Sequence, residues 1–158
     1  MRKVLLFVVL ALSTSLLFLS SLNAQPSNDA IKALRKIDAT VSMGVNFTDY
    51  GRLMAESNYA MQEYLSKPTK NQPLDRAIKD AWDLYVLAKR TWTNISGQPA
   101  RYISRGVDQN LYDALMKIPG MSQTITGGSI AVQLALPVIW SNASKKVKLA
   151  SQLAEISK

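Results

Sequence analysis

The chain has 158 residues, with 19 lysines and arginines against 11 aspartates and glutamates, and a formal net charge of +8. It has no histidine, so the usual general base near neutral pH and the commonest metal ligand are absent. It has no cysteine either, which excludes a thiolate nucleophile, a disulfide, a cysteine zinc site and a lipoprotein anchor. These totals disfavour an enzyme, and we expect neither a cofactor nor a metal site.

Residues 1–24 have the pattern of a signal peptide. A basic start is followed by an apolar run from Val4 to Leu19 and then by a polar stretch that ends in a small residue, Ala24. We predict cleavage after Ala24, which would leave residues 25–158 as a single helical domain in the periplasm or outside the cell. The alternative is an inner-membrane protein anchored by an uncleaved segment over residues 4–22.

Two helices are predicted in the first third of the exported part. Apolar residues follow helical spacing at Ile31, Leu34, Ile37, Val41 and Val45. A second set is rotated by about half a turn relative to the first and consists of Phe47, Tyr50, Met54, Met61 and Tyr64 or Leu65. A break near Gly44–Asn46 explains the change, because glycine and asparagine end helices readily. We therefore predict helices over residues 29–44 and 47–66.

The stretch Leu74–Ile95 has the clearest helical pattern in the chain. Its apolar residues recur at alternating spacings of four and three, at Leu74, Ile78, Ala81, Tyr85, Ala88 and Trp92. A loop with two prolines precedes it, and Pro73 suits the first turn of a helix, where its missing N–H leaves no bond unmade. Ser96–Pro99 should end the helix.

The next segments are less regular. Gly97–Gly106 is predicted to be a connection, and Val107–Ile118 a short helix that Pro119 and Gly120 end. We predict a loop over Met121–Ser129, with Ser129 as the N-cap of the last helix.

The last predicted helix spans Ile130–Ser157 and changes character along its length. From Ile130 to Trp140 only Gln133 is polar. Eleven residues are too few to cross a bilayer, which takes about 20, so this segment is predicted to be enclosed in the middle of the bundle. Pro137 should kink it. Together the elements predict an all-α fold, a compact bundle of four to five mostly antiparallel helices.

Residues 29–65 resemble uncharacterised small exported helical proteins of cyanobacteria. The shared features are Ala33-Leu34-Arg35-Lys36 and a Gly44-Val45-Asn46 step before Tyr50, and Trp140 followed by Ala143 on the last helix is also similar. The resemblance covers about half of the exported part. It implies a helical fold and export, and it brings no activity.

Positive charge gathers in two places. One consists of Lys67 and Lys70 in the first loop with Arg101 and Arg105 in the second, and the other of Lys145, Lys146 and Lys148 on the last helix. The two loops would lie at opposite ends of the central helix, so they need not form one patch. Such residues are most often part of an ordinary soluble surface. The functional interpretation is attraction to an anionic envelope surface or an acidic protein partner. Our leading hypothesis is therefore an exported non-enzymatic protein that binds a partner or an envelope surface, and we expect no nucleic-acid binding.

A second hypothesis is a small-ligand carrier with an apolar pocket between the central and last helices. Tyr85, Trp92 and Trp140 would line that pocket. Aromatic residues on apolar stripes are more often part of the core, because large rings dominate the buried area of small domains.

A third hypothesis is an enzyme that uses carboxylates alone. The candidate pairs are Glu56 with Glu63, and Asp80 with Asp83, each on one predicted helix face. Such pairs are more often found on solvated helix surfaces. Gly127-Gly128-Ser129 could bind an anion before a helix, but it lacks the spacing and the lysine of a phosphate loop.

Overall fold

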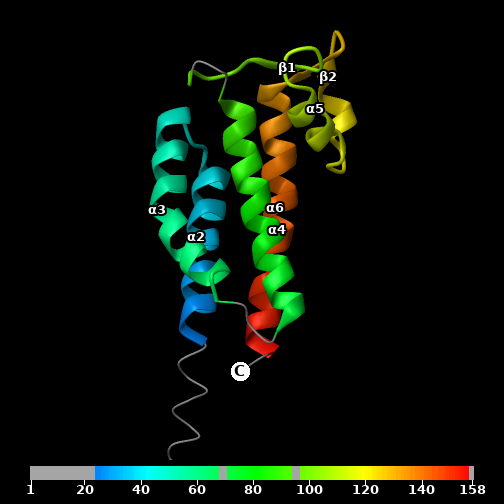
Figure 1. The fold of residues 1–158 in the computed structure, drawn as a ribbon. Coiled ribbons are helices and arrows are strands. Elements are labelled where there is room, and N and C mark those ends of the chain that lie inside the picture. Colours follow the sequence, from blue (N-terminus) through cyan, green and yellow to red (C-terminus); the bar gives the residue numbers. More distant parts are fainter. Residues whose placement is uncertain (1–23, 68–70, 94–96, 157–158) are drawn as a thin grey trace, which may run out of the picture.

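The computed structural model describes residues 24–67, 71–93 and 97–156. Four long helices run up and down in one bundle, and a short helix with a small sheet covers one end (Figure 1). The long helices are α2 (Ala24–Met43), α3 (Phe47–Leu65), α4 (Gln72–Trp92) and α6 (Val132–Ile156), and the short one is α5 (Gln109–Met116). The predicted helical bundle is confirmed, with five α-helices in the described ranges and a small sheet in addition.

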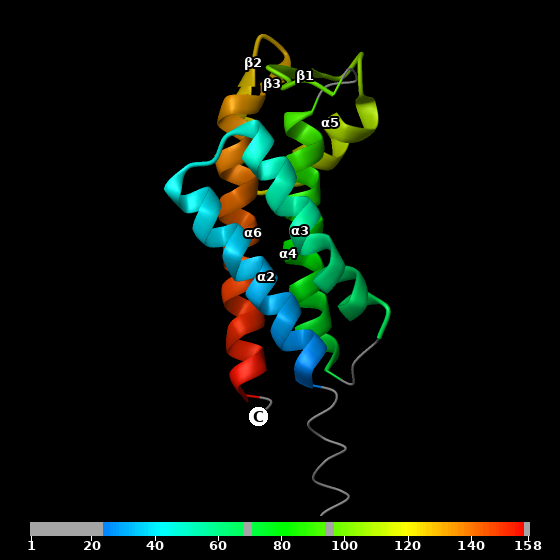
Figure 2. The same ribbon diagram turned by 90° about the vertical axis from the view of Figure 1, so that its left-hand side faces the viewer.

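The break between the first two helices is where the sequence predicts it. Gly44 has a φ of +93°, which a residue with a side chain rarely adopts. Asn46 then caps α3, because its side-chain oxygen accepts the backbone N–H of Asp49 over 2.8 Å. Each helix therefore turns its own apolar stripe inward, and α2 packs on both α3 and α6. Figure 2 shows α2 crossing the bundle obliquely.

Helix α4 lies at the centre of the bundle and packs along its length against α6 (Figures 1 and 2). The Asn71 side chain caps it by accepting the backbone N–H of Leu74 over 3.1 Å. The predicted stripe from Leu74 to Ala88 is buried. The helix ends at Trp92, and Ile95, where we predicted its end, lies outside the described residues.

A three-stranded antiparallel sheet covers the end of the bundle where α4 ends and α6 begins. It consists of β1 (Tyr102–Ser104), β2 (Ile125–Thr126) and β3 (Ser129–Ala131) in the order β1-β3-β2, with a 3₁₀ turn, η1 (Met121–Thr124), before β2. The predicted loop over Met121–Ser129 is therefore wrong, and Ser129 is paired with Ser104 and Thr126 instead of capping a helix. The reason is the pair Gly127-Gly128, whose positive φ values make a tight hairpin turn between β2 and β3.

The start of α6 corrects a second prediction. Ile130, Val132, Ala135, Leu136 and Ile139 are buried, as expected for an apolar segment. Leu134, in contrast, is 52% exposed, and Pro137 is exposed as well. The prediction that the bundle encloses this segment on every side is therefore wrong for one side, because α2, α3 and the sheet leave that side uncovered.

The predicted signal segment lies almost entirely outside the described residues, and Ala24 is the first residue of α2. The first buried residue of the described core is Ala30, so cleavage after Ala24 would leave that described core intact. Among the helices of the described ranges, none combines the length and the apolar character that a membrane span needs.

Candidate functional site

Four aromatic rings meet near the strand end of the bundle. Phe47 and Tyr50 come from the first turns of α3, Trp92 from the last turn of α4 and Trp140 from α6. Neighbouring ring centroids are 5.6–5.8 Å apart, with tilted or edge-to-face geometry, which is favourable for aromatic pairs. The rings hold the ends of three helices together.

A network of hydrogen bonds connects this cluster to α2 and to the middle of α4. The Tyr50 hydroxyl donates to the backbone oxygen of Tyr85 over 2.9 Å, and the Tyr85 hydroxyl donates to Asp38 Oδ1 over 3.2 Å. Burial raises the pKa of both tyrosines, and the negative charge of Asp38 raises the pKa of Tyr85 further. Both phenols therefore stay protonated as donors. They are structural groups and not general acids or bases.

The indole nitrogen of Trp140 has no such partner. Its Nε1 atom is buried and makes no hydrogen bond within the described residues, although it lies close enough to Tyr50 to offset part of the rise in the pKa of that phenol. A buried donor without a partner costs about 1–3 kcal/mol. The position of Trp140 is therefore set by packing and not by a polar contact.

An open cleft of about 890 Å³ borders the aromatic cluster. Val45, on the connection between α2 and α3, lines it together with residues from the start of α6. The lining residues come from five parts of the chain and are Val45, Trp92, Ala100, Arg101, Tyr102, Thr126, Ala131, Val132, Gln133, Leu134, Leu136, Pro137 and Trp140. Protein sites for small molecules have volumes of about 300–1,000 Å³. Three further hollows, lined by residues of α2, α4 and α6, measure about 300–350 Å³ each.

The walls of the cleft combine apolar and polar surface and are partly exposed. Leu134 and Pro137 on α6 line it, and so does Tyr102, which is 61% exposed. The polar lining groups are Arg101, Gln133, Thr126 and the Tyr102 hydroxyl. Arg101 is the only charged residue among the described residues that line the cleft. Such a site can hold an apolar body and present one cation to it.

The structure brings together two of the three residues that we predicted for a pocket. Trp92 and Trp140 line the cleft. Tyr85 is fully buried, lines none of the described hollows, and belongs to the hydrogen-bond network instead. Our sequence reasoning missed Tyr102, Leu134 and Pro137. The signal that could have found the last two is the segment from Ile130 to Trp140, which has apolar residues on more sides than its neighbours can cover.

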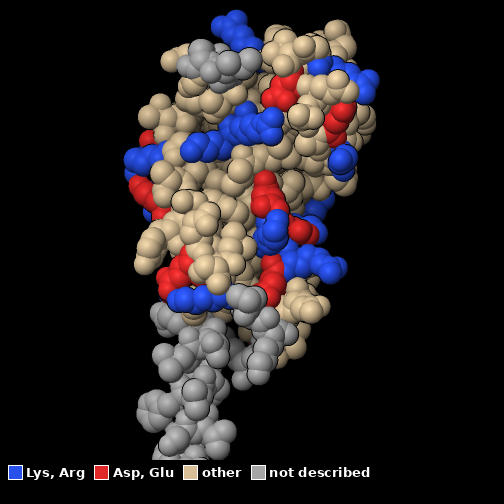
Figure 3. Space-filling view, in the orientation of Figure 1, with Lys and Arg blue, Asp and Glu red and all other residues tan. Residues whose placement is uncertain are grey.

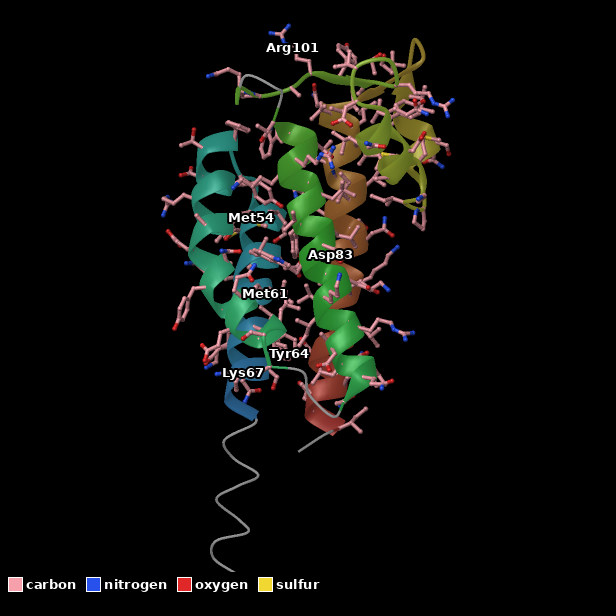
Figure 4. The ribbon with its side chains drawn as sticks, viewed as in Figure 1. Met54, Met61, Tyr64, Lys67, Asp83 and Arg101 are labelled. Carbon is pink, nitrogen blue, oxygen red and sulfur yellow. The ribbon has the colours of Figure 1, made fainter. Side chains whose placement is uncertain are left out.

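The predicted basic groups lie at three separate places. Lys67 is near one end of the bundle and forms an ion pair with Glu63 over 2.9 Å, whereas Arg101 is at the opposite end (Figure 4). Arg105 pairs with Asp113 over 3.5 Å, and Lys146 pairs with Asp80 over 2.8 Å. Lys145 and Lys148 form no ion pair within the described residues, and Lys70 lies outside them. Figure 3 shows basic and acidic side chains interspersed on one face of the molecule.

The candidate catalytic carboxylates are all in ion pairs on the surface. Glu56 pairs with Lys36 over 2.9 Å and with Arg52 over 3.0 Å. A hydrogen bond from Lys36, with the charges of Lys36 and Arg52, holds the pKa of Glu56 below its usual value, so this carboxyl is a poor general acid. Asp83, on the outer side of α4 in Figure 4, pairs with Lys79 over 2.5 Å. In none of these pairs do the two carboxylates face one cleft.

Within the described residues no three acidic side chains come together in a way that could hold a metal ion. No protein-family model, no curated protein and no solved structure matches this chain. The resemblance to exported cyanobacterial proteins therefore stays a prediction. The fold and the cleft define the class of the molecule as a helical bundle with a sheet-covered end and an open apolar site.

Proposed function

We propose that this chain is an exported, non-enzymatic binding protein that holds a small apolar ligand in the cleft at the strand end of the bundle. The observation that carries the proposal is the uncovered side of α6, where Leu134 and Pro137 face a concave site instead of the core. Apolar surface that stays in contact with water is unfavourable, and a ligand that covers it recovers that free energy. Two indole rings give the ligand rigid walls.

The partner or envelope-surface hypothesis has weaker support. Electrostatic attraction to a surface works best when the charges form one patch. Of the seven basic residues, the six that the structure describes lie at the two ends of the bundle and on α6, and three of them have acidic partners. The observation that favours the envelope-surface hypothesis is the pair Lys145 and Lys148, which lie one turn apart on α6 and form no ion pair within the described residues. Co-sedimentation with anionic liposomes at low and high salt tests it, and no binding at low salt would exclude the surface version.

Export is part of the proposal and rests on the pattern of residues 1–24. Support comes from burial, because the first buried residue of the described core, Ala30, lies six residues after the proposed cleavage site. The intact mass of the protein isolated from its host would distinguish cleavage after Ala24 from an uncleaved anchor over residues 4–22.

Binding can be tested with N-phenylnaphthylamine, a neutral dye that becomes fluorescent in apolar surroundings. The full chain should bind it, and Leu134→Asn should weaken binding about five- to tenfold, because most of an apolar contact side chain is lost. The matched control is Leu149→Asn. Leu149 is on the same helix, is 43% exposed, and lines a different hollow.

Comparison of Leu134→Asn with the control variant shows where the dye binds. Equal losses in the two variants, or a loss only in Leu149→Asn, would place the dye elsewhere and reject the cleft. A chain that does not bind the dye at all would reject the proposed function. Native mass spectrometry of the protein purified from its host adds an independent test, since a carrier should retain a bound small molecule.

A further inference from the structure

Arg101 is fixed at the rim of the cleft by its backbone. Its carbonyl oxygen accepts the N–H of Val132, the first residue of α6, over 3.0 Å. The next residue, Tyr102, is paired with Ala131 in the sheet. The Arg101 side chain projects from the end of the bundle (Figure 4). The position of the cation is therefore set by the sheet, while its guanidinium group stays in water.

This guanidinium has no acidic partner within the described residues. Arg52, Arg90 and Arg105 each form an ion pair, and Arg101 does not. All 11 acidic residues of the sequence lie in the described ranges, and none of them lines the cleft. The mouth of the cleft is therefore positive and favours an anionic group.

The apolar wall runs away from this charge along α6. Leu134, Pro137 and Trp140 follow at intervals of three residues, so they extend over about 9 Å at a rise of about 1.5 Å per residue. Leu134 is close to the start of the helix, where Val132 contacts Arg101, and Trp140 is two turns further on. The cleft thus has a charged end and an elongated apolar end.

We propose that the ligand of this cleft is a single-chain amphiphile with an anionic head, whose chain lies against α6 and whose head is bound by Arg101. This inference rests on the proposed function and adds the chemical class of the ligand. A carboxylate or a phosphate matches the guanidinium, which donates two parallel hydrogen bonds to either group. The ligand therefore binds in one orientation, with its head toward the sheet.

The test is displacement of N-phenylnaphthylamine from the full chain, near neutral pH, by ten-carbon compounds that differ only in the head. Decanoate and decyl phosphate should bind about fivefold more tightly than decanol, and decyltrimethylammonium should bind more weakly than decanol. In about 1 M salt, where the Debye length is about 3 Å, the preference for the anions should shrink. Octanoate should bind about tenfold more weakly than decanoate, because two buried methylenes are lost.

The variant Arg101→Gln should bind decanoate and decanol equally, with both affinities measured by displacement of the dye from that variant. Its matched control is Lys145→Gln, which removes an exposed charge that is also outside any ion pair within the described residues and is not part of the cleft lining. This variant should keep the preference. Arg101→Lys should keep a part of the preference for the anions over decanol. Either order of the two anions supports the proposal, and tighter binding of decyl phosphate would indicate a phospholipid source over a fatty acid.

The outcomes separate this inference from the proposed function. If the dye binds and decanol competes as well as the anions, or if Arg101→Gln keeps the preference, the anionic class is rejected and the apolar site stands. Failure of every ten-carbon compound to displace a bound dye would also reject the inference alone. Absence of dye binding would reject both.

Discussion

The Tyr85 hydroxyl of α4 donates a hydrogen bond to Asp38 Oδ1 of α2 over 3.2 Å. The other oxygen of the same carboxylate accepts the Ser144 hydroxyl of α6 over 3.3 Å, and the Tyr50 hydroxyl of α3 donates to the Tyr85 backbone oxygen. These groups connect all four long helices. The ring of Tyr50 also packs against Trp92 and Trp140, which line the cleft, so this network is joined to the elements that build the site.

Replacing Tyr85 by phenylalanine should lower the free energy of unfolding by about 1–2 kcal/mol. The ring stays, but Asp38 loses one of its two donors and remains half-buried. Urea denaturation followed by tryptophan fluorescence measures the change. The matched control is Tyr59→Phe, at a tyrosine that is 77% exposed, which should change stability by less than about 0.5 kcal/mol. Equal effects at the two positions would show that the hydrogen bond contributes nothing.

Stability should fall at alkaline pH because of the same tyrosines. Burial raises the pKa of Tyr50 and Tyr85 in the folded state, whereas in the unfolded chain they ionise near pH 10. Below pH 10 both are neutral in either state, so their contribution is complete. Above it the unfolded chain loses protons that the folded chain keeps, and unfolding becomes easier by up to about 1.4 kcal/mol per pH unit for each tyrosine.

The measurement is the free energy of unfolding between pH 8 and about pH 11. Lysines also titrate in this range, so the informative quantity is the difference between variants. The double variant Tyr50→Phe, Tyr85→Phe should have a shallower loss above pH 10 than the original chain, and Tyr59→Phe should not. Parallel curves for the double variant and the original chain would contradict the expected effect of burial.

The long helices could be predicted because each one combines a continuous apolar stripe with a local signal at its ends. The stripe from Leu74 to Ala88 and the break at Gly44 are both of this kind, and both are confirmed. The sheet was missed although its turn is visible in the sequence. Gly127 and Gly128 separate Ile125-Thr126 from Ser129-Ile130, which is a hairpin signal, but strands of two or three residues give too little alternation to recognise.

The cleft could be predicted only in part, for a different reason. An apolar stripe shows that a surface avoids water, but it does not show which neighbour covers it. Trp92 and Tyr85 are both on the stripe of α4, yet one lines the cleft and the other is enclosed, because Trp92 is the last residue of α4 and Tyr85 lies about two turns further inside. Arg101 was predicted as part of a basic group. Its place beside Leu134 depends on the pairing of β1 with β3, which the sequence pattern did not reveal.

Asn46 should be important for the aromatic cluster as well as for α3. Its side chain accepts the Asp49 N–H and donates to Asp49 Oδ2 over 2.6 Å, which fixes the first turn that carries Phe47 and Tyr50. Asn46→Ala should therefore lower stability by about 1 kcal/mol and weaken the near-ultraviolet circular dichroism of the tryptophans. Asn46→Ser, which keeps a capping oxygen, should restore most of both. If serine were no better than alanine, the cap would not be the cause.

Replacing Pro137 should raise the stability of the protein and lower its affinity for the ligand. The proline lies inside α6 without an N–H, so the Gln133 carbonyl receives no helical hydrogen bond from this position, and both residues line the cleft. Pro137→Ala restores that donor and removes the ring from the wall. We expect the free energy of unfolding to rise by about 1–2 kcal/mol and the affinity for N-phenylnaphthylamine to fall severalfold.

The control for this prediction is Pro73→Ala in the first turn of α4. There the missing N–H leaves no helical bond unmade, so the variant should lose about 0.5–1 kcal/mol through the greater freedom of the unfolded chain and should bind the dye normally. Opposite signs of the stability change at the two prolines would show that the strain is specific to α6. A Pro137→Ala chain that is less stable, or that binds the dye as well as before, would mean that the proline neither strains the helix nor shapes the site.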